Sequence, residues 1–128
     1  AGMYTPEGTP SGSVTAVRYR NKPMNDQEIF RKLAELKNQG NAVSLATIVE
    51  AEGSTPREVG AKMIVCADGT VYGSVGGGCG ESQVKSAALR CLLTKNNTEL
   101  IKVSLLDDLG TKGGDVCGGT MRLFVEKV

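Results

Sequence analysis

The 128-residue chain carries 15 lysines and arginines against 14 aspartates and glutamates, so its formal net charge is +1. This length suits one domain, and the balanced charge lacks the clustered basic excess that a nucleic-acid-binding protein needs. No apolar stretch approaches the ~20 residues of a membrane span, and the first residues lack the apolar run of a secretory signal. Hydrophobic residues make up 40% of the chain but aromatic ones only 4%, which predicts a mainly aliphatic core.

The four cysteines, Cys66, Cys79, Cys91 and Cys117, are widely and irregularly spaced. No Cys-x-x-Cys pair occurs among them, which favours a cytoplasmic protein with free thiols over a disulfide scaffold. The chain contains no histidine. This excludes Ser-His and Cys-His catalysis and mixed Cys/His zinc sites, and a four-cysteine zinc site would lack the usual paired spacing.

The first helix is predicted to follow a tail. Residues 1–23 are rich in Gly, Pro, Ser and Thr and are expected to be a tail or extension, with residues 24–128 forming the domain. Asn25 can cap a helix, and Glu28 completes a capping box. Gly40 is the expected end of this helix. One helical face would carry its apolar side chains, which are Ile29, Phe30, Leu33 and Leu36.

Three strands and a second helix are predicted next. Residues 42–51 read as a central strand that is apolar on both faces. Residues 62–66 and 71–75 form two short strands, and the Asp-Gly pair between them predicts a hairpin. A helix over residues 81–95 follows, with an apolar face made of Val84, Ala88, Cys91 and Leu92.

The last two strands are marked by alternating apolar residues on either side of a glycine-rich stretch at 107–119. Their apolar positions are Ile101, Val103 and Leu105, and then Met121, Leu123 and Val125. The predicted fold class is α/β (α+β), a single domain whose mixed β-sheet of about five strands packs against two main helices. The hairpin excludes a wholly parallel sheet.

The first loop, residues 52–60, gathers two hydroxyls, those of Ser54 and Thr55, and one arginine, Arg57, beside a proline. The guanidinium could bind a phosphate or a carboxylate through two parallel hydrogen bonds. The alternative is a solvated loop whose proline and glycines only set its shape.

The second loop, residues 73–81, contains three consecutive glycines and lies between a predicted strand and a predicted helix. Helix N-termini present free N–H groups and attract anions, and glycines let a ligand approach the backbone. Known phosphate motifs do not match. Glu81 replaces the third glycine of a dinucleotide fingerprint, no Gly-Lys-Ser/Thr follows, and Tyr72 replaces the first glycine of a nucleophile elbow. A general anion or cofactor cradle remains.

Two of the cysteines lie among glycines. Cys79 falls at the predicted start of the second helix, where thiols have lowered pKa values and act as nucleophiles or metal ligands. Cys117 falls in the third loop, residues 113–119, and the two thiols would share one pocket if the sheet brings these loops together. The alternative is a structural cysteine in each case. Cys66 and Cys91 are expected to be buried as small hydrophobes.

Three stretches of the chain, "ATIVEAEGSTPREVGAKMIV", "DGTVYGSVGGGCGES" and "VCGGTMRLFVE", resemble the N-terminal domain of the XdhC/CoxI family in order and spacing. The resemblance runs from about Asp26 to the end of the chain. It implies a cytoplasmic accessory protein, rather than an enzyme, that binds a molybdopterin-type cofactor. The cofactor would be protected during sulfuration and delivered to the apo-enzyme of a molybdenum hydroxylase, such as xanthine dehydrogenase or carbon monoxide dehydrogenase.

Many family members continue into a Rossmann-type domain, which this chain does not contain before it ends at Val128. A separate Rossmann-domain chain or self-association into a homo-oligomer is therefore expected. No membrane or nucleic-acid partner is expected.

Site roles follow from combining the resemblance with the chemistry of the three loops. Cys79 and Cys117 are candidates to contact molybdenum or its sulfur, and Arg57 and Lys62 are candidates to bind the phosphate. The expected cradle comprises Ser54, Thr55, Gly76, Gly77, Gly78, Glu81 and Gly118. One alternative is a sulfur-transfer protein, in which Cys79 or Cys117 carries a persulfide received from a cysteine desulfurase. The other is a non-catalytic interaction subunit.

Overall fold

The computed structural model describes residues 22–76, 78–105 and 118–128, with the backbone alone described at positions 78 and 79. The predictions for most of the N-terminal tail, for Gly77 and for Cys117 lie outside these residues.

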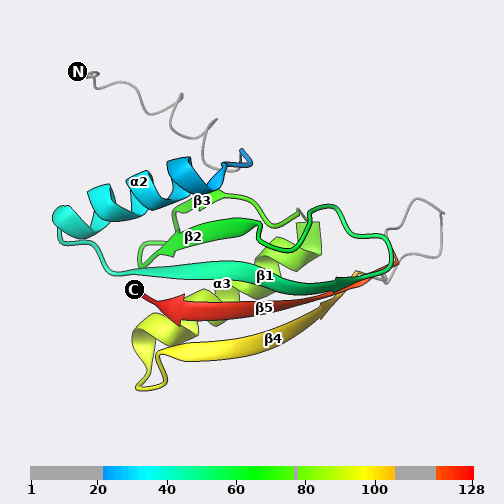
Figure 1. Cartoon of the computed structure of the whole chain (residues 1–128). Coiled ribbons are helices and arrows are strands. Elements are labelled where there is room, and N and C mark those ends of the chain that lie inside the picture. The colour runs from blue at the N-terminus through cyan, green and yellow to red at the C-terminus, as the bar shows by residue number, and fades with distance from the viewer. Residues whose placement is uncertain (1–21, 77, 106–117) are drawn as a thin grey trace.

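Five strands form one sheet in the order β3-β2-β1-β5-β4, and two helices pack against it (Figure 1). This confirms the predicted fold class. All four strand pairs are antiparallel. Outside the strands, Ser54 and Gly118 form an isolated parallel bridge. The elements are α2 (Asp26–Asn38), β1 (Val43–Glu52), β2 (Lys62–Cys66), β3 (Val71–Gly73), α3 (Gly78–Leu93), β4 (Thr98–Ser104) and β5 (Thr120–Lys127).

Helix α2 begins at the predicted capping box. The Glu28 N–H donates to Asn25 Oδ1 over 2.8 Å, and the Asn25 N–H donates to Glu28 Oε1 over 2.9 Å. Gly40 follows the last turn with a φ of +85°, as its place after the helix predicted. The prediction for Phe30 is wrong, because its side chain is 48% exposed. It lies about 100° around the helix from its buried neighbour Ile29, so it turns out of the face that packs on the sheet.

Strand β1 is central and apolar on both faces in its first half, as predicted. Val43 and Leu45 pack on the α2 side, whereas Ala46 and Ile48 pack on the α3 side. A register shift then places a β-bulge at Val49, whose side chain is 46% exposed. Beyond the bulge, β1 continues to the end of the sheet at which the first loop begins.

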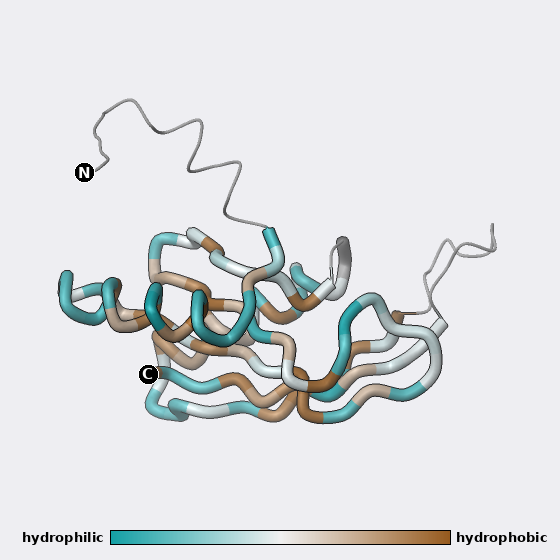
Figure 2. Tube along the Cα trace, turned by 45° about the horizontal axis from the view of Figure 1, so that its top comes forward, coloured by the Kyte–Doolittle hydropathy of each residue, from teal (hydrophilic) through white to brown (hydrophobic). Residues whose placement is uncertain are grey.

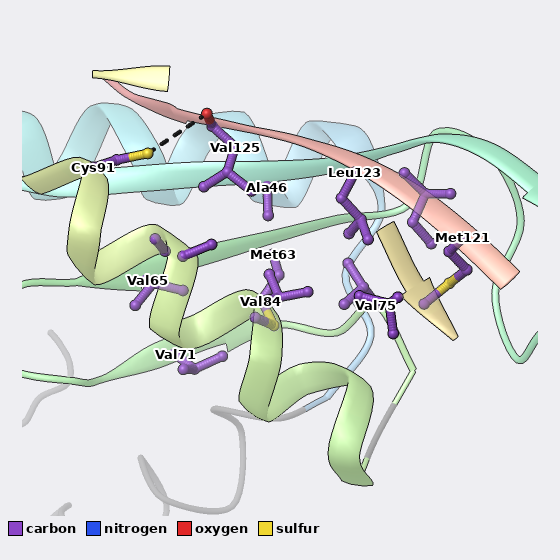
Figure 3. Packing of buried hydrophobic residues seen from close by; sticks show 14 residues of the cluster. Ala46, Met63, Val65, Val71, Val75, Val84, Cys91, Met121, Leu123 and Val125 are labelled. Atoms are coloured by element: carbon purple, nitrogen blue, oxygen red, sulfur yellow. Dashed lines mark hydrogen bonds between the residues drawn. The ribbon is translucent and has the colours of Figure 1, made fainter. Parts of the chain in front are cut away.

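The two faces of the sheet carry separate cores. The core on the α3 side gathers residues from the strands and the inner face of α3 (Figure 3). The core on the α2 side is smaller and involves mainly β1 and β2. Figure 2 shows hydrophobic positions gathered in the strands and alternating with hydrophilic ones along α2.

Cys66 and Cys91 belong to these cores, one on each side of the sheet. Burial raises the pKa of both thiols, which keeps them protonated at neutral pH. The Cys91 Sγ lies 3.7 Å from the Val125 carbonyl oxygen (Figure 3). Both residues are therefore the small hydrophobes that the sequence predicted.

None of the helices in the described ranges has the length and apolar character needed to cross a membrane.

Candidate functional site

One end of the sheet brings together the first loop, the second loop and Gly118 and Gly119, which are the part of the third loop that the structure describes. Because neighbouring strands are antiparallel, β1, β3 and β4 terminate at this end, while β2 and β5 begin there (Figure 1). The first loop leaves β1, the second loop joins β3 to α3, and the third loop leads into β5. The topology thus brings together segments that are far apart in the sequence.

The first and third loops meet through their backbones. Ser54 forms a β-bridge with Gly118, and the neighbouring Gly119 lies directly against the first loop. A Cβ atom at Gly119 would collide with the carbonyl oxygens of Ser54 and Glu52. The Leu105 N–H, at the end of β4, donates to the Gly119 carbonyl over 2.8 Å. Only glycine permits this approach at position 119.

The first and second loops are joined by the side chain of Arg57. One guanidinium N–H, at Nη1, donates to the Ser74 carbonyl over 2.6 Å. The Pro56 ring packs on the second loop at Gly76, where a Cβ atom would lie 2.9 Å from Pro56 Cγ. The Thr55 hydroxyl donates to the Arg57 carbonyl over 3.0 Å and fixes the turn that carries the arginine. Arg57, predicted as a ligand for phosphate, therefore also positions the second loop.

The second loop is tied to α3 by Ser74, which is only 4% exposed. Its hydroxyl donates to the Glu81 carboxylate in the first turn of α3 and accepts the Gly76 N–H over 3.1 Å. Ser74 was not among the predicted site residues. The signal that could have found it is local, because a serine two residues before a glycine commonly accepts that residue's N–H in a turn.

The start of α3 lies among the three loops. The helix begins at Gly78, three residues before the predicted start. A Cβ atom at Gly80 would make ordinary contacts with Leu105, Val103 and Met121, the nearest at 3.5 Å. Free N–H groups and a partial positive charge are therefore presented at the point where the loops meet.

The predicted site residues divide into three groups. The structure brings together six of them, Ser54, Thr55, Arg57, Gly76, Glu81 and Gly118. The backbones of Gly78 and Cys79 lie in the first turn of α3. The Cys79 side chain and all of Cys117 lie outside the description, so their convergence stays a prediction.

Lys62 forms the third group, because its side chain lies at the start of α2. Its Nζ donates to Asp26 Oδ1 over 3.0 Å and to the Gly60 carbonyl over 2.9 Å, and it sits 5.6 Å from the centroid of the Phe30 ring. A phosphate would have to compete with the Asp26 carboxylate for this cation.

Comparison with known proteins finds relatives by sequence and by structure. The uncharacterised protein YqeB of Escherichia coli is 35% identical over 76% of this chain and 18% of its own length. The molybdenum cofactor insertion chaperone PaoD of Escherichia coli is 35% identical over 78% of this chain and 31% of its own. A crystal structure described as a xanthine dehydrogenase from Bacillus halodurans superposes with a TM-score of 0.67 at 29% identity, over 82% of this chain and 31% of that one.

The chain therefore spans less than a third of the length of each of these relatives. The model of the XdhC and CoxI family matches residues 36–104, which is more than half of the chain and includes the first and second loops. By this match, the chain belongs to the XdhC and CoxI family.

Proposed function

We propose that this chain binds molybdenum cofactor as cargo and passes it to the apo-enzyme of a molybdenum hydroxylase, of which xanthine dehydrogenase and carbon monoxide dehydrogenase are examples. The observation that carries the proposal is the meeting of three loops around the start of α3. A relative with 35% identity is named a molybdenum cofactor insertion chaperone, which supports the same role.

The chemistry of the site fits the cargo. The cofactor carries a phosphate, and the helix start offers N–H donors for which an anion is the natural ligand. Glycine at position 76 lets the Pro56 ring of the first loop pack directly on the second loop, which holds the two loops together at the helix start. Cys79, in the first turn of α3, is the proposed sulfur contact for the metal end of the cargo, because soft thiolates bind such metals. In this proposal the chain binds the cofactor, shields it and releases it to the apo-enzyme.

Anaerobic titration of the purified chain with molybdenum cofactor tests the proposal. We expect saturable binding in the micromolar range, weakened at least tenfold by Gly76→Ala, because the new Cβ would meet the Pro56 ring. Gly40→Ala is the matched control. Its φ is also positive, at +85°, but it lies after α2 with no atom within 4 Å of the new Cβ. Equal binding by both variants, or no binding by the folded wild-type chain, contradicts the proposal.

The same preparations separate carriage of the cofactor from transfer of sulfur. A carrier should retain the cofactor without taking up labelled sulfur from a cysteine desulfurase. In that case Cys79→Ala weakens retention of the cofactor, and neither the wild-type chain nor the variant carries a labelled persulfide. Labelled sulfur that accumulates on wild-type Cys79 and disappears in Cys79→Ala would instead indicate the sulfur-transfer function.

A further inference from the structure

A cleft of about 490 Å³ opens between the first loop and the start of α2. Its volume lies within the ~300–1,000 Å³ typical of small-molecule sites. Its walls include Met24 and Pro56, and Val59, whose side chain is 58% exposed. Covering such an exposed aliphatic side chain with a flat apolar surface removes apolar area from water, which lowers the free energy. The cleft therefore offers apolar contact to the faces of a planar ring.

Four polar side chains line the cleft, those of Asn25, Asp26, Arg57 and Glu58. The Asn25 side-chain oxygen already caps α2, where it accepts the Glu28 N–H. The exposed Glu58 carboxylate has no hydrogen-bond or ion-pair partner within the described ranges. Its backbone is fixed, because the Ala61 N–H donates to the Glu58 carbonyl over 3.0 Å and the Gly60 N–H donates to the Ile48 carbonyl over 2.8 Å. The other carboxylate of the cleft, that of Asp26, is already paired with Lys62.

The donor of the cleft is Arg57, whose guanidinium has five N–H groups. One of these, at Nη1, is used by the Ser74 carbonyl. A carboxylate and a guanidinium that line one cleft can together bind a ring edge that carries two N–H donors and one carbonyl acceptor in a row. The 2-amino-4-oxopyrimidine edge has this pattern, and both pterin and guanine carry it.

We propose that this cleft binds the pterin ring of the cargo, with Glu58 accepting from the 2-amino group and the ring N–H, and Arg57 donating to the 4-oxo group. The inference rests on the proposed function, which supplies a pterin-containing ligand. It deepens that function, because the cleft adjoins the three-loop site. Pro56 lines the cleft and also packs on Gly76, and Arg57 lines the cleft and also holds Ser74. The pterin end and the phosphate end of one molecule would thus have neighbouring subsites.

Fluorescence titration with 6-hydroxymethylpterin and with lumazine tests the assignment. Lumazine replaces the 2-amino group by an oxo group, so it presents an acceptor where Glu58 needs a donor. We expect the wild-type chain to bind the pterin about tenfold more tightly than lumazine, which is the effect of one hydrogen bond to a charged group. Glu58→Gln should remove most of this preference. Glu52→Gln, an exposed carboxylate outside the cleft, should preserve it.

The outcomes of this titration distinguish a pterin site from a site without preference for pterin and from a guanine-nucleotide site. Equal affinity for pterin and lumazine, or an unchanged preference in Glu58→Gln, overturns the inference. Guanosine that binds more tightly than the pterin also overturns it, because the cleft would then belong to a guanine nucleotide.

Titration with the intact cofactor tests the proposed function separately from the pterin subsite. If the cofactor binds and Gly76→Ala weakens it, while free pterin does not compete, only the pterin subsite fails. If free pterin binds with the expected preference but the intact cofactor does not, the subsite stands as a pterin site and the proposed cargo fails.

Discussion

The two faces of the sheet are covered to very different extents. Helix α3 contacts β1, β2, β4 and β5, and the core beneath it contains 14 buried residues in the part of the chain that the structure describes. Helix α2 packs mainly on β1 and β2, with Lys32 over the Tyr72 ring of β3, above a core of seven buried residues among those described. The α3 face thus holds the domain together and fixes the three-loop site at one end of its helix. The α2 face leaves room for the cleft and exposes side chains on β4 such as Leu100, which is 60% exposed.

The largest expected difference between the faces is in stability. Leu123→Ala empties a fully buried position of the α3-side core and should lower the free energy of unfolding by about 2–5 kcal/mol. Leu33→Ala removes the same atoms from the smaller α2-side core and should cost less, because that side chain borders solvent and water can enter the space. Urea denaturation of both variants measures the difference. A larger loss for Leu33→Ala would show that α2 is the more important helix.

The contact between the first and third loops should be the next most sensitive feature. Gly119→Ala forces a Cβ atom into the carbonyl oxygens of Ser54 and Glu52 and should cost about 1–3 kcal/mol, or more where the backbone cannot move. Gly80→Ala is its control, because the new Cβ makes only ordinary contacts in a helix and should stabilise the chain by up to about 1 kcal/mol. Thermal unfolding of the two variants should move in opposite directions. A shift in the same direction would contradict the packing of Gly119.

Replacing each of the two buried serines, Ser74 and Ser44, with alanine tests which of their hydroxyls contributes to the candidate site. Ser74→Ala leaves the Gly76 N–H and the Glu81 carboxylate without their partner and should cost about 1–3 kcal/mol, with weaker cofactor binding. Ser44→Ala removes a 2.9 Å bond to the Ala88 carbonyl, which keeps its helical partner, so about 1 kcal/mol or less is expected. Cofactor titration of both variants provides the check. Normal binding by Ser74→Ala would remove that serine from the site.

The smallest effect concerns the ion pair between α3 and β4. Two 2.9 Å hydrogen bonds from Arg90 lower the pKa of the Glu99 carboxyl below its ordinary value. The pair therefore stabilises the fold above the unfolded-state pKa of about 4.3, and this contribution is lost as the pH falls through the lower folded-state pKa. Glu99→Gln should be slightly less stable than wild type at pH 7 and equal to it at the acidic end of the titration. A difference that grows as the pH falls would reverse the assigned sign.

Most of the fold could be predicted from local signals in the sequence. The capping box at Asn25 and Glu28, the Asp-Gly hairpin and the alternating apolar residues of β5 each specify their element without help from the rest of the chain. The start of α3 could not be predicted in this way. Its first turn contains Gly78 and Gly80, and glycine has a low intrinsic helix preference, so the local signal argues against a helix there.

The candidate site could be predicted only in part, for the same physical reason. The glycine-rich sequences predicted three candidate loops, but the antiparallel strand order decides which loops lie at the same end of the sheet. Ser74 and the positioning bond of Arg57 depend on contacts across that end. Lys62 looked equivalent to Arg57 in sequence, yet the structure commits it to Asp26.

Hydrogen–deuterium exchange with and without molybdenum cofactor tests the central claim most directly, because it reports all three loops in one experiment. The account predicts simultaneous protection of backbone amides in residues 53–61, 74–81 and 118–120, with exchange in the second half of α2 unchanged. Retention of the cofactor without added protection in these three segments would contradict it and would place the binding site elsewhere on the chain.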